Sequence, residues 1–334
     1  MFRNVYIEGI GSYHPSRIVG NDYYVNHFEK YGMEEHAIDL MEKVGRERRT
    51  LADENETSIT MAAEAAKKAI EDAKLESKDI DAIISVSDTP EFLTPCCALI
   101  LKNMLQADKA TNVFDINNDC IGMLTGIDIA TKYLQTDKKY KRILVVGSMH
   151  ISPFAKEDDL VVYGCISDGA AAVVLVVKEE EEERGFLGSR MYTDDTYNET
   201  IRFPACGLSN ITNNDIEPED KKMLWNPFDF SFLSEKWSEL IIGLLKEHGY
   251  SESNVTHYFM SQFSKFDVGL TMEKLGASSD QAIFIGHKYG YTGCASPIMA
   301  LDDRLKREEF KKDDISIFCS VAGGYTMAAL LYKW

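Results

Sequence analysis

Long apolar runs are absent from this 334-residue sequence. No stretch reaches the roughly 18 uninterrupted apolar residues that suggest a membrane-spanning helix. The first residues, MFRNVYIEGI, also lack the charged region and the long apolar core of a secretion signal. These absences predict a chain that neither spans a membrane nor is exported.

Basic residues are scarce relative to acidic ones. The chain has 36 Lys and Arg against 54 Asp and Glu, which gives a formal net charge of -18. Because phosphate backbones bind dense basic surfaces, this balance argues against nucleic acid as a general partner. Part of the acidic excess lies in the run EEEEE at 179–183, which we interpret as a solvated loop.

Disulfide and metal-binding patterns are missing as well. The seven cysteines, at 96, 97, 120, 165, 206, 294 and 319, form no CxxC pair and show no ligand-like histidine spacing. An odd, scattered set of this kind is typical of reduced thiols. We therefore expect a cytoplasmic protein without a metal site.

Hydrophobic residues make up 45% of the sequence, which is enough for two average domains or one large α/β unit built by duplication. Both halves show the order helix, strand, strand, helix, strand, strand. The first half begins with a capped helix at Thr57 or Ser58 and continues through DIDAIISVS, NVFDINNDCIGMLTG, ILVVGSMH and GAAAVVLVV. The second begins at Ser234 and continues through VTHYFMSQ, AIFIGHKYGYTGCAS, ISIFCSV and YTMAALLYKW. We expect two similar α/β layers packed together.

The domain boundaries follow from this repeat. Residues 1–178 form the half that carries Cys120, and residues 234–334 form the other half. Between them, residues 179–233 are an acidic linker followed by a segment rich in aromatic residues and turn formers, which we expect to line a pocket.

The stretch FDINNDCIGMLTG places Cys120 where an extended segment ends and a helix begins. Helix N-termini offer free N–H groups and the positive end of the dipole, which lower a thiol pKa. We expect Cys120 to react with iodoacetamide faster than the other thiols, and to be able to attack a thioester. Because free cysteine is often buried, an inert packing role is the alternative on composition alone. Gly122 and Gly126 would let another backbone approach the helix closely.

Seven segments, in order, resemble the thiolase superfamily, and within it the ketoacyl-ACP synthase III branch of condensing enzymes. They are IEGIGSYHPSRIVGN, VGRERR, AIISVSDTPEFLTP, FDINNDCIGMLTG, SDGAAAVVL, KYGYTGCAS and AGGYTMAALLYKW. The resemblance implies a thiolase-like fold, in which two duplicated α/β halves form a layered αβαβα architecture. It implies that Cys120 takes the acyl group from acyl-CoA or acyl-carrier protein, without a bound cofactor. The backbone N–H groups of Cys120 and of Gly323 or Gly324 would form the oxyanion hole.

The partners of the family's cysteine are substituted. The family has a histidine in a His-Gln-Ala-Asn motif and an asparagine in a Tyr-Gly-Asn-Thr motif, where this sequence has SQFS and YGYT. Ser261 therefore falls on the histidine position and Tyr291 on the asparagine position. His287 is a candidate substitute base if a bend carries it inward, whereas His257 would lie about 13 Å along a strand from Ser261. Loss of enolate-stabilising donors should weaken decarboxylative condensation more than acyl loading.

The resemblance also suggests contacts with the acyl carrier. Arg46 lies in the coenzyme-side segment VGRERR, with surface salt bridging as the alternative for its arginines. The family's phosphate-binding arginine falls on Phe266, beside Lys265. In the family, the segment after the first strand packs at a twofold interface, and Phe92 is the apolar candidate to reach a neighbour's pocket.

Three hypotheses remain open from sequence. The first is a ketoacyl synthase III-like acyltransferase with an altered second step. The second is a non-catalytic subunit that pairs with an active homologue. The third is a binding protein for acyl-CoA or an acylated carrier. A homodimer, or a heterodimer with a homologue, is expected.

Overall fold

The computed structural model describes residues 1–307 and 310–334. Nine of its strands form two layers, the first and the second sheet, which a single residue pair joins into one continuous nine-stranded sheet. The first contains, in spatial order, β5 (Asn112–Ile116), β4 (Ala82–Val86), β6 (Arg142–Met149), β7 (Gly169–Glu180) and β1 (Phe2–Tyr13). The second contains β11 (Val255–Met260), β12 (Ile315–Ala322), β13 (Thr326–Lys333) and β8 (Gly185–Thr193). Only the pairing of Val5 with Gly185 joins β1 to β8. The strand order therefore repeats between the halves.

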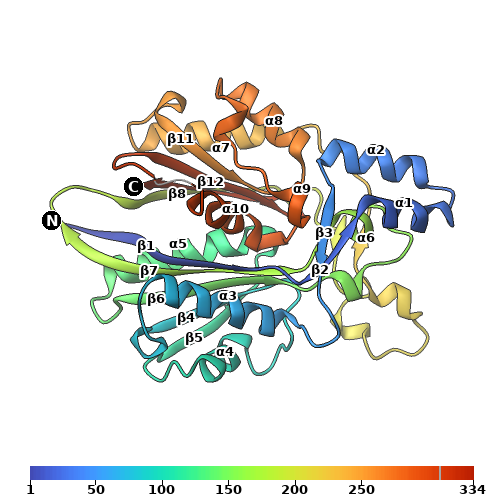
Figure 1. Ribbon diagram of the computed structural model, residues 1–334, viewed down its shortest axis with the longest axis horizontal. Helices are drawn as coiled ribbons and strands as arrows, with labels where there is room; N and C mark the ends of the chain where they lie inside the picture. The colour runs from blue at the N-terminus through green and yellow to red at the C-terminus, as the bar shows by residue number, and fades with distance from the viewer. Residues whose placement is uncertain (308–309) are drawn as a thin grey trace.

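Helices complete a five-layer arrangement (Figure 1). The helices α3 (Ser58–Asp72) and α4 (Cys97–Leu105) cover the outer face of the first sheet. The helices α7 (Leu233–Glu247) and α8 (Lys265–Lys274) cover the outer face of the second. Between the sheets lie α5 (Gly122–Thr136) and α10 (Ser296–Leu305). The expected αβαβα architecture, with its duplicated halves, is confirmed.

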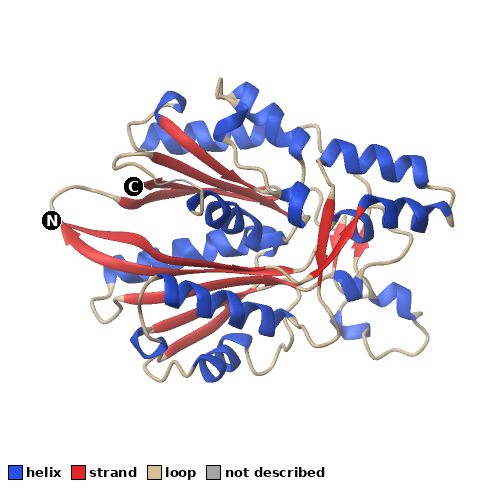
Figure 2. Cartoon of the chain, viewed as in Figure 1, coloured by secondary structure: helices blue, strands red, loops and turns tan. Residues whose placement is uncertain are grey.

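The remaining elements gather at one end of the layers, on the right in Figure 2. The helices among them are α1 (Asn21–Glu29), α2 (Glu34–Val44), α6 (Val162–Cys165) and α9 (Gly286–Tyr289). Two small sheets lie there as well: β2 (Arg17–Gly20) pairs with β3 (Arg48–Leu51), and β9 (Ile201–Arg202) pairs with β10 (Leu224–Trp225). The first-half sheet has its parallel strands β5, β4 and β6 side by side. Loops that follow parallel strands meet at their common carboxyl edge, where α/β proteins place their sites.

Local signals in the sequence fix the main helix ends. The Thr57 side chain accepts a hydrogen bond from the Thr60 backbone, and the Thr60 side chain accepts from the Thr57 backbone, so a capping box starts α3 at Ser58. Helix α7 begins at Leu233, one residue before the expected Ser234. Gly249, just beyond the end of α7, has φ +76°, which glycine adopts without strain.

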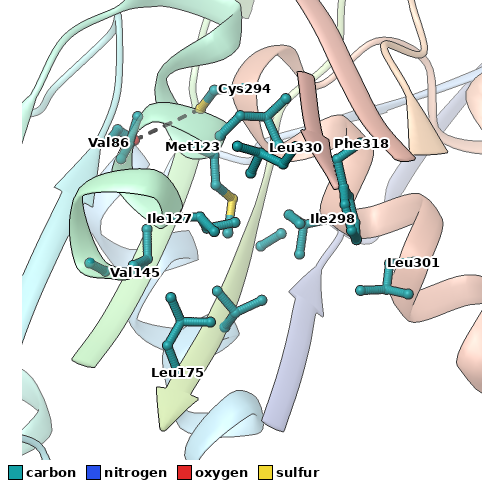
Figure 3. Close-up of a cluster of buried hydrophobic side chains, with 14 of the residues drawn as sticks. Val86, Met123, Ile127, Val145, Leu175, Cys294, Ile298, Leu301, Phe318 and Leu330 are labelled. Carbon is teal, nitrogen blue, oxygen red and sulfur yellow. Dashed lines mark hydrogen bonds between the residues drawn. The ribbon is translucent and has the colours of Figure 1, made fainter. Parts of the chain in front are cut away.

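The layer between the sheets is a dense apolar core (Figure 3). Met123 and Ile127 from α5 meet Ile298 and Leu301 from α10, and side chains of both sheets close around them. A Cβ atom on Gly126 would lie 3.0 Å from a methyl group of Val145. The helix therefore packs closely on valine side chains of the sheet, rather than on another backbone as the sequence had suggested.

Two sequence expectations differ from the structure. The expected linker 179–233 contains β8, which pairs with β13 and completes the second sheet, so the second half begins well before residue 234. The expected strand at AIFIG is reduced to one bridge between Tyr258 and Ala282. No helix of the described ranges is long and apolar enough to cross a membrane.

Candidate active site

The corner at Cys120 is held by side chains on both of its sides. After β5 ends at Ile116, the chain turns through Asp119 and Cys120 in a short 3-10 turn, and α5 follows. Asp119 has φ +45°, a left-handed conformation that is uncommon outside glycine. The Ser320 hydroxyl of β12 donates to the Cys120 carbonyl at 3.2 Å. The backbone of Cys120, in the first half, is thus held by a side chain of the second half.

Cys120 lies on the wall of a narrow pocket with a cavity volume of about 100 Å³. Small-molecule sites usually offer roughly 300–1,000 Å³. The segment 201–237 supplies most of the apolar lining, through Ile201, Phe203, Met223, Trp225, Phe228, Phe230, Leu233 and Trp237. The pocket is therefore small and mainly apolar, which suits a short apolar group.

Ser261 and Tyr291 meet at Cys120. Ser261 follows β11 and is fully buried, and its backbone N–H donates to the Cys319 carbonyl at 2.9 Å. Burial raises the pKa of the Tyr291 phenol well above its usual value, the Cys120 thiol raises this pKa further, and the Ser261 hydroxyl opposes the rise. The Tyr291 phenol is therefore close to both the thiol and the Ser261 hydroxyl, although the Ser261 oxygen makes no hydrogen bond within the described residues. The two substituted positions come together with the cysteine.

Gln262 and Arg46 hold the loops that carry these groups. The Gln262 amide nitrogen donates to the carbonyls of Met260 and Ile283, at 2.8 and 2.9 Å. Arg46 donates to the Gly286 carbonyl at 2.9 Å and to the carbonyl of Phe263. Arg46 is 2% exposed, and burial lowers its pKa to about 10. Arg46 is therefore not a surface residue. Its buried guanidinium holds the two loops that form the pocket wall.

The expectation of a low pKa at Cys120 is wrong. Burial is the largest cause and raises the pKa of the thiol well above its usual value, and the carboxyl groups of Asp88 and Asp119 raise it further. A hydrogen bond with the Tyr291 phenol acts in the opposite direction without reversing the shift. A helix terminus offers only partial charges, whereas removal from water penalises the full thiolate charge.

Asp88 is a site residue that sequence reasoning missed. It follows β4 by two residues, as Asn118 follows β5, and Val86 of β4 pairs in parallel with Ile116 of β5. Asp88 and Asp119 both line the pocket. The signal was present in AIISVSDTPEF, because an acidic residue just after a buried parallel strand belongs to the same sheet edge as Cys120.

His287 does not reach the pocket. Its ring stacks on Phe284 at 6.3 Å, and burial lowers its pKa, while Glu47 opposes that change. The residues that line the pocket do not include His287. The chain at this point forms the short helix α9, and the His287 side chain does not reach the pocket. His287 therefore does not take the place of the missing base. His257 stacks on Phe310 at 4.5 Å, in the core behind β11.

The glycine turn after β12 supplies one candidate oxyanion donor. Gly323 lies on the pocket wall together with Cys120, whereas Gly324 does not line the pocket. Gly324 has φ +73° and turns the chain toward β13. The backbone N–H groups of Cys120 and Gly323 are therefore the pair that remains for an oxyanion hole.

The residues expected to bind the carrier lie outside this pocket. Lys265 lines a separate surface groove with Arg46 and Glu47. Phe266 is 48% exposed, and the Lys43 ammonium lies 5.3 Å from its ring centre. Phe92 is 49% exposed and does not line the pocket of its own chain.

Comparison with known proteins identifies the family. Two parts of the 3-oxoacyl-[acyl-carrier-protein] synthase III family model match residues 114–195 and 245–334, together just over half of the chain. The beta-ketoacyl-[acyl-carrier-protein] synthase III of Clostridioides difficile is 29% identical over 330 residues, covering 98% of each chain.

Solved structures give the same result for the fold. The 3-oxoacyl-[acyl-carrier-protein] synthase III of Aquifex aeolicus has a TM-score of 0.83 and 25% identity, and the match covers 99% of this chain and 100% of that one. The enzyme of the same name from Pseudomonas aeruginosa has a TM-score of 0.85 at 20% identity, covering 99% and 98%. The matched family parts include both the Cys120 corner and the Ser261 and Tyr291 loops, and the chain therefore belongs to the 3-oxoacyl-[acyl-carrier-protein] synthase III family of the thiolase superfamily.

Proposed function

We propose that this protein is a thioester-dependent acyltransferase that carries an acyl group on Cys120 and completes an altered second step. The observation that carries the proposal is that Cys120 and Tyr291 line one mainly apolar pocket, with the buried Ser261 close to the Tyr291 phenol. The donor is acyl-CoA or an acylated carrier protein, since the relatives are named as synthases that use such a carrier. No resident cofactor takes part. Seven free thiols fit a reducing, cytoplasmic setting.

Loading requires the Cys120 sulfur to attack the thioester carbonyl. The new C–S bond forms as the carrier thiolate leaves, and the N–H groups of Cys120 and Gly323, two residues that line the pocket, would stabilise the developing oxyanion. The raised pKa of the thiol slows this step but does not prevent it, because the small thiolate fraction is the attacking form.

The second step lacks the family's two donors. Ser261 and Tyr291 stand where the histidine and the asparagine would stabilise the enolate of a malonyl thioester. Removal of one such donor typically costs about 10²- to 10³-fold in rate. The Tyr291 phenol can donate a hydrogen bond, but its ring, packed against Phe263 at 5.3 Å, also occupies space next to the cysteine. Condensation is therefore slow or absent.

A second candidate function is a non-catalytic subunit or an acyl-thioester-binding partner of an active homologue. The raised pKa of Cys120 favours it, because a thiol held in its neutral form is a poor nucleophile. This protein would then keep the pocket without turnover and pair with the homologue.

We also propose a dimer, with itself or with a homologue. Four large apolar side chains are exposed along the segment that ends in α4, namely Phe92, Leu93, Leu99 and Met104. Exposed apolar patches are typical of interaction sites. Light scattering of the purified chain at micromolar concentration is expected to give about twice the 37.7 kDa chain mass, and a value of 37.7 kDa would contradict the homodimer.

Intact-mass measurement after incubation with acyl-CoA or acyl-carrier protein tests the proposal. A mass increase of one acyl group is expected, and it should be lost in Cys120→Ala but kept in the matched control Cys294→Ala. If no thioester leaves an adduct, the non-catalytic subunit is the better interpretation.

A further inference from the structure

The pocket around Cys120 holds two carboxyl groups that its proposed first step does not use. Asp88 reaches it from the end of β4 and Asp119 from the turn before α5. Within residues 1–307 and 310–334, neither carboxyl group has an ion-pair or side-chain hydrogen-bond partner. Backbone N–H groups of Asp88 and Thr89 donate to the Asp88 carboxyl group, but no ion pair among the described residues balances the charge of either carboxyl group beside Cys120. Charged groups in such a place are normally neutralised by a partner, so this pair needs an explanation.

The groups that face Asp88 are all acidic or neutral. They are Asp119 and Cys120 from the first-half corner, and Tyr291 and Cys294 from the second half. Burial raises the pKa of Asp88 to about 7, and the neighbouring Asp119 carboxylate contributes to the rise. An acid with a pKa close to the working pH is well suited to accept and return a proton.

A malonyl thioester is a poor fit to these surroundings. Its free carboxylate would place a further negative charge next to Asp88 and Asp119, in an enclosed pocket where like charges are screened little by solvent. A neutral acceptor avoids this repulsion, and its O–H or N–H group supplies the proton that Asp88 can take. The two carboxyl groups therefore favour a neutral acceptor over a malonyl thioester, and Asp88 can take the proton that this acceptor releases.

We propose that Asp88 is the proton acceptor of the second step, in which the acyl group moves from Cys120 to a neutral hydroxyl or amine. The inference rests on the proposed function. The acceptor oxygen or nitrogen attacks the thioester carbon while its proton passes to the Asp88 carboxylate. The C–S bond then breaks, the Cys120 thiolate leaves, and Asp88 returns the proton to sulfur. No other reactant is needed, and the high proton affinity of the thiol favours the last transfer.

Asp88→Asn and Asp119→Asn make a matched pair for the test. Each protein is loaded with acetyl-CoA and desalted, and loss of the acetyl group to water and to added ethanol, a neutral hydroxyl acceptor, is followed by intact mass from pH 5 to 9. In a parallel measurement, iodoacetamide labelling of Cys120 is followed on the unloaded proteins.

The deacylation rate of the unsubstituted protein should rise with pH, and the midpoint of this rise should lie near pH 7. Asp88→Asn should deacylate about 10²-fold more slowly and lose the rise. The same variant should label faster at Cys120, because a negative charge that raises the thiol pKa is gone. Asp119→Asn should keep the rise and move it to lower pH, because Asp119 raises the pKa of Asp88.

Equal deacylation rates in Asp88→Asn and the unsubstituted protein would overturn the proposal. Slower deacylation together with slower labelling would also overturn it, since that pattern indicates general damage to the Cys120 corner. If no acetyl adduct forms on any of the proteins, the proposed acyltransferase itself fails, and the role of Asp88 fails with it.

Discussion

Cys120 and Cys294 occupy equivalent places in the two halves of the molecule. Each is the middle residue of a short 3-10 turn, Asp119–Ile121 or Gly293–Ala295, which leads into one of the two helices between the sheets. Burial raises the pKa of both thiols. The place at a helix start is thus shared, and it does not by itself make either thiol acidic.

The surroundings separate the two thiols. Cys294 points toward the Val86 carbonyl, with its sulfur 3.9 Å away, and belongs to the central apolar core (Figure 3). Cys120 lines the pocket, with the Tyr291 phenol and the carboxyl groups of Asp88 and Asp119 around it. A substrate can meet only the thiol that borders a cavity. The two halves therefore contain similar corners, but the neighbouring loops leave a cavity only beside Cys120 and bury Cys294 in the core.

Restoring the family's residues around Cys120 should produce the largest effect. In a Ser261→His, Tyr291→Asn double variant, decarboxylation of malonyl-CoA is expected to rise by about 10²-fold, because donors for the enolate return. Release of radiolabelled carbon dioxide measures it. The control Tyr291→Phe keeps the ring but loses the phenol and should stay slow. Rapid, Cys120-dependent release by the unsubstituted protein would show that the present residues already support condensation.

The carboxyl group that distinguishes the Cys120 corner should make stability depend on pH. The pKa of Asp88 is about 7 in the folded state against the usual 3.8, so the folded state binds more protons than the unfolded state between these values. The free energy of unfolding therefore falls as pH rises through this window, by up to about 4 kcal/mol. Above pH 7, Asp88→Asn should be more stable than the unsubstituted protein.

Urea unfolding at pH 5 and pH 8 measures this dependence. The gain of Asp88→Asn over the unsubstituted protein should be larger at pH 8 than at pH 5. Identical pH dependence in the two proteins would mean that Asp88 titrates normally in the folded state.

The rate of thiol labelling should differ between the two corner cysteines and Cys206. Cys206 and Cys120 are both partly exposed, whereas Cys294 is buried. At pH 7, iodoacetamide should modify Cys206 before Cys120, because the raised pKa of Cys120 protects its thiol, and it should modify Cys294 last. Labelling of Cys120 should rise by about tenfold per pH unit below its pKa. Peptide mapping gives the order. If Cys120 is labelled first at pH 7, its thiolate is stabilised more than the structure indicates.

The smallest effect should come from the second corner. Cys294→Ala removes one buried atom from the core and should lower the free energy of unfolding by about 1 kcal/mol, as small core truncations do. Acyl loading should not change. A loss of loading in this variant, with stability kept, would show that the two corners act together.

The sequence was sufficient to identify the fold, and it predicted which thiol lies at the strand-to-helix corner that borders the pocket. Periodic apolar runs, the Thr57 capping signal and seven family-like segments predicted the duplicated layers, because these patterns are local and recur in order. Motif spacing likewise placed Ser261 and Tyr291 on the partner positions, and the structure brings both to Cys120. Both residues lie at the ends of predicted elements, so the register of the motifs was enough to place them near Cys120.

Other properties of the site depended on the tertiary structure. The sequence showed Cys120 at a helix start, but burial and two carboxyl groups from different segments set its pKa. Arg46 looked like a surface cation and is buried, while His287 looked near enough to help and lies outside the pocket. Asp88 was unremarked, 32 residues before the cysteine. Distance along the chain does not report distance in space, and the cost of charge depends on how much water the packed neighbours leave around each group.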